Sequence, residues 1–314
     1  MYLTLTQLRV FAAVSGHGSV RGAARALDMA QSGVTQQLHK LELSVGGAIF
    51  NRTNRGVTLT ALGERLLVRT RSILGECTRA EQEMRQIQGE MYGTVAFGIA
   101  TEPLILALPP VLNDFHNRWP AVETHLMSGT SRKMISWVRK GSLDFAIALT
   151  SDRSDTTDLS VTPLYQSEPA IICRQGHPLQ MKTSIADLVD CKWIGTRQPD
   201  LSESPVNRLI DLFADNGLPK PQIVATTEAL FDTLHLVSRT DYLSLEPSII
   251  VQHPFFERAL TRIAIEEPIG KASICLIHRQ AVPLTPAAQQ LCSMLASYAR
   301  STTTQPRLGS LALC

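Results

Sequence analysis

The stretch SVRGAARALDMAQSGVTQQLHKLE, residues 19–42, decides the fold of the N-terminal part of the chain. Its first apolar residues recur every three or four positions, as on the buried face of a helix: Val20, Ala23, Ala24 and Leu27. Ser19 is suited to cap that helix. After Asp28 the same spacing restarts with Val34, Leu38 and Leu41. Two short helices joined by about three residues have the dimensions of a helix-turn-helix.

The outward positions of the second helix carry uncharged side chains that form hydrogen bonds: Gln31, Ser32, Thr35 and Gln36. A helix face that meets only solvent is normally rich in Lys and Glu, whereas Gln, Ser and Thr suit the reading of base edges in DNA. For Gln37 or Lys40 alone, an ordinary polar helix surface is the better explanation. We therefore predict that Gln31, Ser32, Thr35 and Gln36 together contact DNA.

A longer set of residues around this unit matches a known pattern in order: Phe11, Gly18, Ser19, Ala23, Ala24, Leu27, Gln31, Val34, Leu38, Leu41, Glu42, Gly46, Ile49, Phe50, Arg52, Arg55, Gly56, Leu59, Thr60 and Gly63. The segment resembles the DNA-binding domain of LysR-type transcriptional regulators. So many ordered matches are far more specific than one short motif. Thr35 and Gln36 depart from the usual family residues, which leaves the operator sequence open.

Length and composition fit a multidomain globular protein. The chain has 314 residues, of which 44% are hydrophobic. The sequence contains no apolar run long enough to span a membrane and opens with no secretory leader, so we expect a cytoplasmic protein.

The net charge of +2 hides an uneven distribution along the chain. Residues 1–71 hold nine Lys or Arg against three acidic residues, a charge of +6, and the remaining 21 basic and 25 acidic residues leave −4 in residues 72–314. The positive charge thus accompanies the helix-turn-helix, as binding to DNA phosphates requires.

Two further elements follow the helix-turn-helix. Residues 49–58 read as two short strands around a basic tip, a wing whose Arg52 and Arg55 would contact phosphates or the minor groove. Thr60 is suited to cap the next helix, in which apolar and small residues alternate steps of four and three: Leu66, Thr70, Ile73, Cys77, Ala80, Met84, Ile87 and Met91. This heptad seam predicts a long linker helix that forms a dimer.

From Thr94 onward, short apolar runs alternate with amphipathic segments, which predicts an α/β fold with parallel sheets and covering helices. The predicted strands are 94–100, 122–127, 143–149, 170–174, 192–196, 222–226, 242–245 and 273–278. The predicted helices are 103–117, 130–140, 184–189, 204–216, 228–238 and 284–299.

The family resemblance implies an architecture for the whole chain. The expected fold class is α/β with an N-terminal all-α winged helix-turn-helix, a long linker helix, and a two-lobed effector domain like a periplasmic binding protein. The implied domains are 1–60 for DNA binding, 61–91 for the linker, 92–300 for the effector, and a mobile tail at 301–314. Lobe 1 would comprise 92–162 and 269–300 and lobe 2 163–268, with crossing strands near 163–166 and 265–269. The stretch 185–260 also resembles regulators of aromatic-compound and aromatic-sulfonate catabolism.

Ligands of doubly wound lobes bind where strand ends meet helix N-termini. Such junctions supply the candidate effector residues: Ala100, Thr101, Glu102, Ser128, Gly129, Thr130, Thr196, Arg197, Thr226 and Thr227. Each hydroxyl residue is equally an ordinary helix cap, and Thr101 in particular is predicted to cap the helix that follows it. Hydroxyls and helix N-termini favour a small anion or hydroxylated acid, although Glu102 would repel a carboxylate.

Other classes of protein fit the sequence less well. An enzyme lacks support, because no Ser-His-Asp order, phosphate loop, metal cluster or paired-carboxylate motif is present, and we expect no cofactor and no metal. A transporter's solute-binding protein conflicts with the first ninety or so residues. The open alternative is a cytoplasmic small-molecule-binding protein or redox sensor switched by its six cysteines. The expected partners are promoter DNA, a small effector that is anionic or aromatic, further copies of the chain as a dimer or tetramer, and RNA polymerase.

Overall fold

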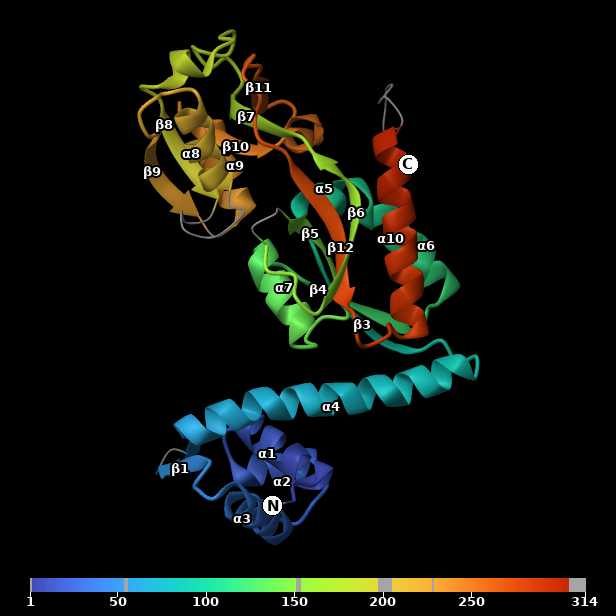
Figure 1. Cartoon of the computed structure of the whole chain (residues 1–314). Helices are drawn as coiled ribbons and strands as arrows, with labels where there is room; N and C mark the ends of the chain where they lie inside the picture. The colour runs from blue at the N-terminus through green and yellow to red at the C-terminus, as the bar shows by residue number, and fades with distance from the viewer. Residues whose placement is uncertain (1, 54–55, 151–153, 197–204, 228, 305–314) are drawn as a thin grey trace. The chain divides into compact units, whose positions relative to one another are not determined.

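The structure is a computed structural model that describes residues 2–53, 56–150, 154–196, 205–227 and 229–304 (Figure 1). The chain forms two compact units. The first comprises residues 1–90 and 140–142, and the second comprises residues 91–139 and 143–314.

The first unit contains the predicted helix-turn-helix. Helices α1 (Leu5–His17), α2 (Val20–Ala26) and α3 (Gln31–Val45) pack around one apolar core. That core holds Ala23, Ala24, Val34, Leu38 and Leu41, as the helical spacing predicts, together with Phe11 and Val14 of α1. Ser19 caps α2, as predicted, because its Oγ accepts a hydrogen bond from the Gly22 amide at 3.1 Å.

A two-stranded antiparallel wing follows, with β1 (Phe50–Thr53) paired to β2 (Gly56–Leu59). The Glu42 carboxylate on α3 fixes its start by accepting a hydrogen bond from the Ile49 amide at 3.1 Å. Thr60 caps helix α4 (Ala61–Ile87), and its Oγ1 accepts from the Gly63 amide at 3.0 Å. A Cβ at Gly63 would overlap the Ile49 carbonyl oxygen, so only glycine allows α4 to pack this closely on the wing.

Helix α4 is the predicted linker helix, but it ends at Ile87 and not at Met91. Met91 belongs instead to the second unit, where it packs against an apolar core. Three large apolar seam residues are exposed on α4, with exposed fractions of 41% for Ile73, 54% for Met84 and 65% for Ile87, and Ala80 is exposed as well. These residues form an exposed apolar stripe on α4.

Lobe 1 of the second unit contains a five-stranded sheet in the order β4-β3-β5-β12-β6. Its strands are β3 (Gly93–Ile99), β4 (Val122–Met127), β5 (Phe145–Thr150), β6 (Leu159–Ser167) and β12 (Ala272–Arg279). Helices α5 (Thr101–Leu106), α6 (Leu108–Arg118) and α10 (Pro286–Thr304) cover one face, and α7 (Ser131–Arg139) covers the other. Alternation along β5 feeds both cores, because Phe145 and Ile147 face one side and Ala146 and Ala148 the other.

Lobe 2 contains the three-stranded sheet β10-β7-β11 and the parallel pair β8-β9. The strands are β7 (Pro169–Arg174), β8 (Lys192–Thr196), β9 (Gln222–Thr227), β10 (Ser244–Pro247) and β11 (Leu260–Ile263). Helices α8 (Pro205–Asp215) and α9 (Leu230–Arg239) and the short 3-10 helices η1 (Ile185–Leu188) and η2 (Ser248–Gln252) complete the lobe. The α8 side chains Leu209, Leu212 and Phe213 pack with Trp193 and Leu245, whereas Leu234 and Val237 of α9 pack with Ile172 and Ile250.

Several sequence predictions of local structure were wrong. Parallel pairing was predicted correctly for β3 with β4 and β5 and for β8 with β9. It was wrong elsewhere, since β12 runs antiparallel to β5 and β6, and both neighbours of β7 are antiparallel to it. The strand near 163–166 extends over Leu159–Ser167 within lobe 1, while residues 265–269 form no strand. Helix α10 continues to Thr304, past the predicted start of the tail at residue 301, and residues 305–314 lie outside the described part of the chain.

Candidate functional site

The outer face of α3 presents the predicted DNA-reading residues to solvent. Gln31, Ser32, Thr35 and Gln36 are all exposed, whereas Val34, Leu38 and Leu41 on the opposite face are buried. The helix therefore offers amide and hydroxyl groups in a row suited to base edges in a major groove. Of the wing arginines, Arg52 lies in β1 and its side chain is not described, and Arg55 lies outside the described residues.

A small cavity of about 50 Å³ lies between the two lobes of the second unit. Residues from both lobes line it: Ala100, Thr101, Glu102, Gly129, Ser131, Met134 and Leu149 from lobe 1, and Thr196, Arg208, Leu230, Glu246 and Pro247 from lobe 2. The lining lies at the C-terminal ends of β3, β5, β8 and β10 and at the starts of α5, α7 and α9. This is the position at which α/β sheets bind ligands.

Five of the predicted effector residues come together in this cavity: Ala100, Thr101, Glu102, Gly129 and Thr196. The chain passes close to a ring at Gly129, where a Cβ would lie 2.9 Å from the Trp137 side chain. Thr101 is the first residue of α5 and not its cap, because Ala100 occupies the N-cap position and makes no side-chain hydrogen bond there. That part of the prediction was wrong, since a cap must precede the helical residues.

Among the residues that the structure describes, none of the other predicted effector residues lines the cavity. Ser128 and Thr226 are absent from its lining. Thr130 uses its hydroxyl as a cap for α7, where it accepts from the Lys133 amide at 3.0 Å. Thr227 shares a hydrogen bond of 2.5 Å with Thr233, and Arg197 lies outside the described residues.

Two buried carboxyl groups face the cavity, one from each lobe. Glu102, with 7% exposure, accepts a hydrogen bond from the Ser167 hydroxyl at 2.6 Å. Glu246, with 2% exposure, accepts from Thr196 at 2.5 Å and from Ser244 at 3.1 Å. These bonds hold the carboxyl groups at the cavity wall.

A chain of hydroxyl groups connects the Glu246 side of the cavity to the start of α9. The Oγ1 atoms of Thr196 and Thr233 lie 2.7 Å apart, and Thr233 in turn bonds Thr227. Thr227 also donates to the Ala229 carbonyl at 3.0 Å, next to the first residue of α9. The position of Thr196 is thus fixed by β8, β9 and α9 together.

Sequence reasoning missed several lining residues, among them Ser131, Met134, Leu149, Arg208, Leu230, Glu246 and Pro247. Ser131 comes directly after the candidate residue Thr130, and Glu246 comes directly after the predicted strand 242–245. Extending the candidate junctions along the sequence would therefore have included both residues. Arg208 on α8 gave no such signal, because it sits within a helix whose other residues form an ordinary core face.

Four of the described cysteines are poorly placed for redox chemistry: Cys173, Cys191, Cys275 and Cys292. Burial raises the pKa of Cys173 to about 11 and that of Cys292 to about 12, and burial also raises the pKa of Cys191. Cys275 is buried, with its Sγ 2.9 Å from the Thr150 hydroxyl. Because the thiolate is the reactive form, these thiols are protected at neutral pH.

Two kinds of feature are absent from the described residues. No helix there combines the length and apolar character needed to cross a membrane. No group of three or more His, Cys, Asp or Glu side chains in the described part of the chain is arranged to hold a metal ion.

An exposed reading helix with a wing, together with a two-lobed α/β unit around a cavity, defines a ligand-responsive DNA-binding regulator. Residues 5–73 match the bacterial regulatory helix-turn-helix protein family of lysR type, and residues 88–300 match the LysR substrate binding domain. The chain belongs to the LysR family of transcriptional regulators, and it is a regulator and not an enzyme.

Its relatives are similar over most of their length. The HTH-type transcriptional regulator GbpR of Azospirillum brasilense is 28% identical over 281 residues, covering 88% of this chain and 78% of that protein. The HTH-type transcriptional regulator TdcA of Escherichia coli K12 is 26% identical over 291 residues, covering 93% of this chain and 92% of that protein. The crystal structure of full-length CbnR complexed with target DNA has the same fold, with a TM-score of 0.71 and 20% identity. The match covers 94% of this chain and 100% of the CbnR chain.

Proposed function

We propose that this regulator binds promoter DNA through the outer face of α3 and the wing, and that a small molecule bound between its lobes controls promoter binding or activation. The observation that carries the proposal is the interlobe cavity, which is lined from both lobes and polar at its wall. A ligand that contacts both lobes favours one arrangement of them over another, and it can therefore shift the regulator between states.

The lining also narrows the chemistry of the effector. Among the described lining residues, the charged side chains are Glu102, Glu246 and Arg208. Two carboxyl groups against one guanidinium favour hydrogen-bond donors on the ligand and oppose a simple anion. We therefore propose a small hydroxylated molecule whose acidic group, where it has one, lies toward Arg208. At about 50 Å³ the cavity must widen to admit it, so lobe movement accompanies binding.

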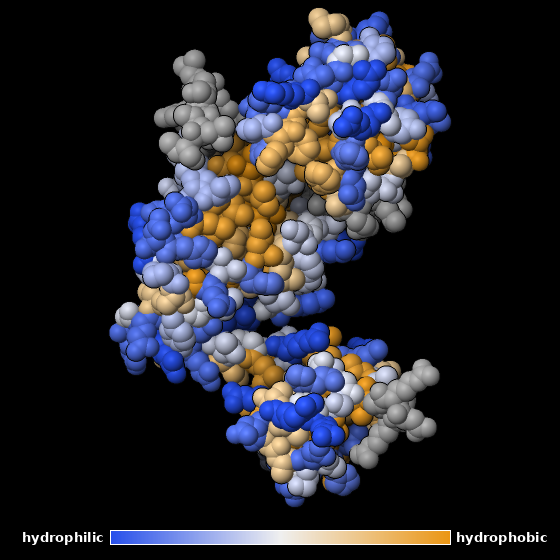
Figure 2. All heavy atoms as spheres, turned by 180° about the vertical axis from the view of Figure 1, so that it is seen from behind, coloured by the Kyte–Doolittle hydropathy of each residue, from blue (hydrophilic) through white to orange (hydrophobic). Residues whose placement is uncertain are grey.

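Self-association is part of the same proposal. The exposed apolar stripe on α4 supports a helix pair, because solvent-exposed Ile73, Met84 and Ile87 repeat at heptad spacing. In the second unit, apolar residues gather in one area of the face drawn in Figure 2. Exposed apolar areas commonly mark contacts between proteins. A dimer with a tetramer as the larger assembly, contact with RNA polymerase, and a cytoplasmic location complete the proposal.

The test is a thermal-shift screen of the full-length protein against small hydroxy acids, aromatic acids and sulfonates. A true effector should raise the melting temperature and change operator affinity, and Glu246→Gln should reduce both responses. Lys220→Gln, an exposed change elsewhere in lobe 2, is the matched control. A ligand whose effect survives Glu246→Gln and Thr196→Val unchanged would place the effector outside the cavity.

The cysteine-switch alternative makes a different prediction. If thiol oxidation were the switch, mild peroxide should change operator affinity without any added small molecule. The raised pKa values of Cys173 and Cys292 argue against it, because protonated thiols react slowly with peroxide.

A further inference from the structure

Lobe 2 carries a second concave site, separate from the interlobe cavity. It is an open groove of about 490 Å³ between α9 and the segment that follows η2. Its principal lining residues are Phe231, His235, Arg239, Phe255, Phe256 and Arg258. None of the groove's lining residues lines the interlobe cavity, and the volume falls within the range typical of small-molecule sites, about 300–1,000 Å³.

The groove is built from aromatic rings that face solvent. Phe231 is 66% exposed and Phe255 is 85% exposed, although large apolar side chains normally gain free energy by burial. The rings form a connected set: Phe231 stacks on His235 with ring centroids 6.2 Å apart, and lies 6.5 Å from Phe256. His253 links Phe256 to Phe255, at centroid distances of 6.1 and 5.1 Å. These rings together provide an aromatic surface along the groove.

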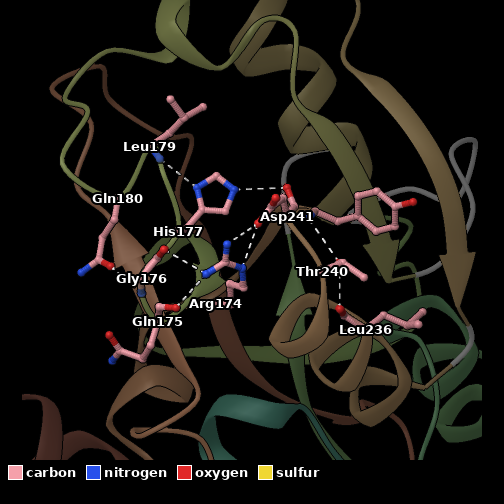
Figure 3. Close-up of polar contacts among 10 residues, drawn as sticks. Arg174, Gln175, Gly176, His177, Leu179, Gln180, Leu236, Thr240 and Asp241 are labelled. Carbon is pink, nitrogen blue, oxygen red and sulfur yellow. Dashed lines mark hydrogen bonds and ion pairs between the residues drawn. The ribbon is translucent and has the colours of Figure 1, made fainter.

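Three arginines line the groove, and one of them is already neutralised. Figure 3 shows the Arg174 guanidinium directed at Asp241, with an ion pair of 2.6 Å and further donation to the carbonyls of Gln175 and Gly176. By contrast, Arg239 and Arg258 are exposed and form no ion pair with another described residue.

No acidic side chain is among the described residues that line this groove. Asp232 and Glu257 neighbour the lining residues in sequence, but neither lines the groove, and Asp241 is occupied by Arg174. The groove therefore combines exposed ring faces with two available guanidinium groups. Guanidinium groups bind carboxylates and related anions through paired hydrogen bonds.

We propose that this groove is a binding site for a small aromatic anion, an aromatic carboxylate or sulfonate. The ligand ring lies on the faces of Phe231, Phe255 and Phe256, and its acidic group meets Arg239 and Arg258. The site is distinct from the interlobe cavity, where two carboxyl groups oppose an anion. The proposal does not depend on what the cavity binds.

The test uses calorimetric titration of the full-length protein with 1-naphthoate and with 1-naphthalenesulfonate. Two analogues separate the contributions: 1-naphthylmethylamine keeps the ring and reverses the charge, and cyclohexanecarboxylate keeps the charge without the aromatic ring. Both aromatic anions should bind with a dissociation constant on the order of 0.1–1 mM, and both analogues should bind at least about tenfold more weakly.

Variants locate the site. The double variants Arg239→Gln with Arg258→Gln, and Phe231→Ser with Phe255→Ser, should each weaken naphthoate binding by about tenfold or more. Lys220→Gln and Met181→Ser are the matched controls, since Lys220 is exposed and Met181 is 86% exposed in the same lobe, outside the groove. Both controls should bind as the unmodified protein does.

Three results would overturn the proposal. The first is no binding of either aromatic anion at about 10 mM. The second is equal binding by the groove variants and their controls. The third is loss of binding in the cavity variant Thr196→Val with retention in the groove variants, which would place the anion between the lobes. Because the substituted groove side chains are exposed, melting temperatures near that of the unmodified protein should show that the variants are folded.

Discussion

Two adjacent glutamines on α3 differ in how far they are exposed. Gln36 is exposed on the outer face of the helix, whereas its neighbour Gln37 is half-buried. A glutamine that forms two hydrogen bonds with adenine carries sequence information, and a polar residue that only meets solvent carries none. The two adjacent glutamines therefore allow a comparison on one helix.

We expect Gln36→Ala to weaken binding to the specific operator by about 1–3 kcal/mol, the value of a bidentate base contact. Binding to unrelated DNA should change little. Fluorescence anisotropy with both DNAs measures the difference, and Gln37→Ala is the control that should leave both affinities near their original values. A parallel fall in specific and non-specific binding would show that Gln36 does not read sequence.

In the second unit, two threonines near the cavity have different partners and should behave differently. Thr196→Val removes the hydroxyl that donates to the buried Glu246, which should lower the free energy of unfolding by about 1–3 kcal/mol and reduce the effector response. Thr130→Val removes the cap of α7, at a cost of about 0.5–2 kcal/mol, and should leave the effector response intact. Urea unfolding and effector titration distinguish the two variants. An effector response that disappears in Thr130→Val alone would reverse their assigned roles.

At the scale of whole elements, the packing of the wing on α4 depends on the absence of one side chain. The Ile49 carbonyl occupies the space where a Cβ of residue 63 would lie. Gly16, on the exposed end of α1, has no atom within 4 Å of such a Cβ. Replacing each of these two glycines by alanine therefore separates the effect of packing on stability from the effect of helix propensity.

Gly63→Ala should destabilise the first unit by about 1–3 kcal/mol through overpacking and should lower operator affinity, because the wing shifts. Gly16→Ala should instead stabilise α1 by about 0.5–1 kcal/mol, since alanine favours helix over glycine. Thermal unfolding of both variants measures the contrast. Equal melting temperatures would mean that α4 does not pack on the wing as described.

The apolar stripe on α4 can be tested in the same way. Ile87→Asp places a charge at a seam position, so dimer formation and operator affinity should both fall. Val68→Asp is the control, because Val68 is 53% exposed on the same helix but lies off the seam. Sedimentation velocity reports the assembly state. If Ile87→Asp remains a dimer, the helix pair is not the contact that holds the protomers together.

How much of the molecule the sequence predicts depends on the range of the interactions involved. Helical spacing located α2 and α3 and the buried Val34, Leu38 and Leu41, because i, i+3 and i+4 contacts are local. Strand direction was predicted correctly for some pairs, such as β3 with β4 and β8 with β9, and wrongly for others. The antiparallel pairing of β12 with β5 joins residues more than one hundred positions apart, and short apolar runs do not encode direction.

Sequence reasoning predicted only those cavity residues that lie at the ends of strands. Thr101 and Glu102 lie just after β3, and Thr196 is the last residue of β8, so their position could be inferred from sequence order. Arg208 and Glu246 reach the cavity through the packing of α8 and β10 in lobe 2, which no local pattern reports. Likewise, Thr130 has the residue type of a ligand contact, but its hydroxyl accepts a hydrogen bond from the Lys133 amide in the first turn of α7.

At the scale of the whole chain, the distribution of charge predicts how DNA affinity depends on salt. Residues 1–71 carry +6 and the remaining residues −4, so the basic N-terminal part should dominate attraction to DNA phosphates. Raising salt from about 50 to 200 mM should therefore weaken binding to specific and unrelated DNA alike, with log affinity falling linearly in log salt. Arg52→Ala and Arg55→Ala should each reduce the slope by about one unit for every phosphate that the arginine neutralises. Arg118→Ala, an exposed arginine on α6 paired with Asp114, is the control and should leave the slope unchanged. Slopes that stay the same in all three variants would place the wing arginines away from the DNA backbone.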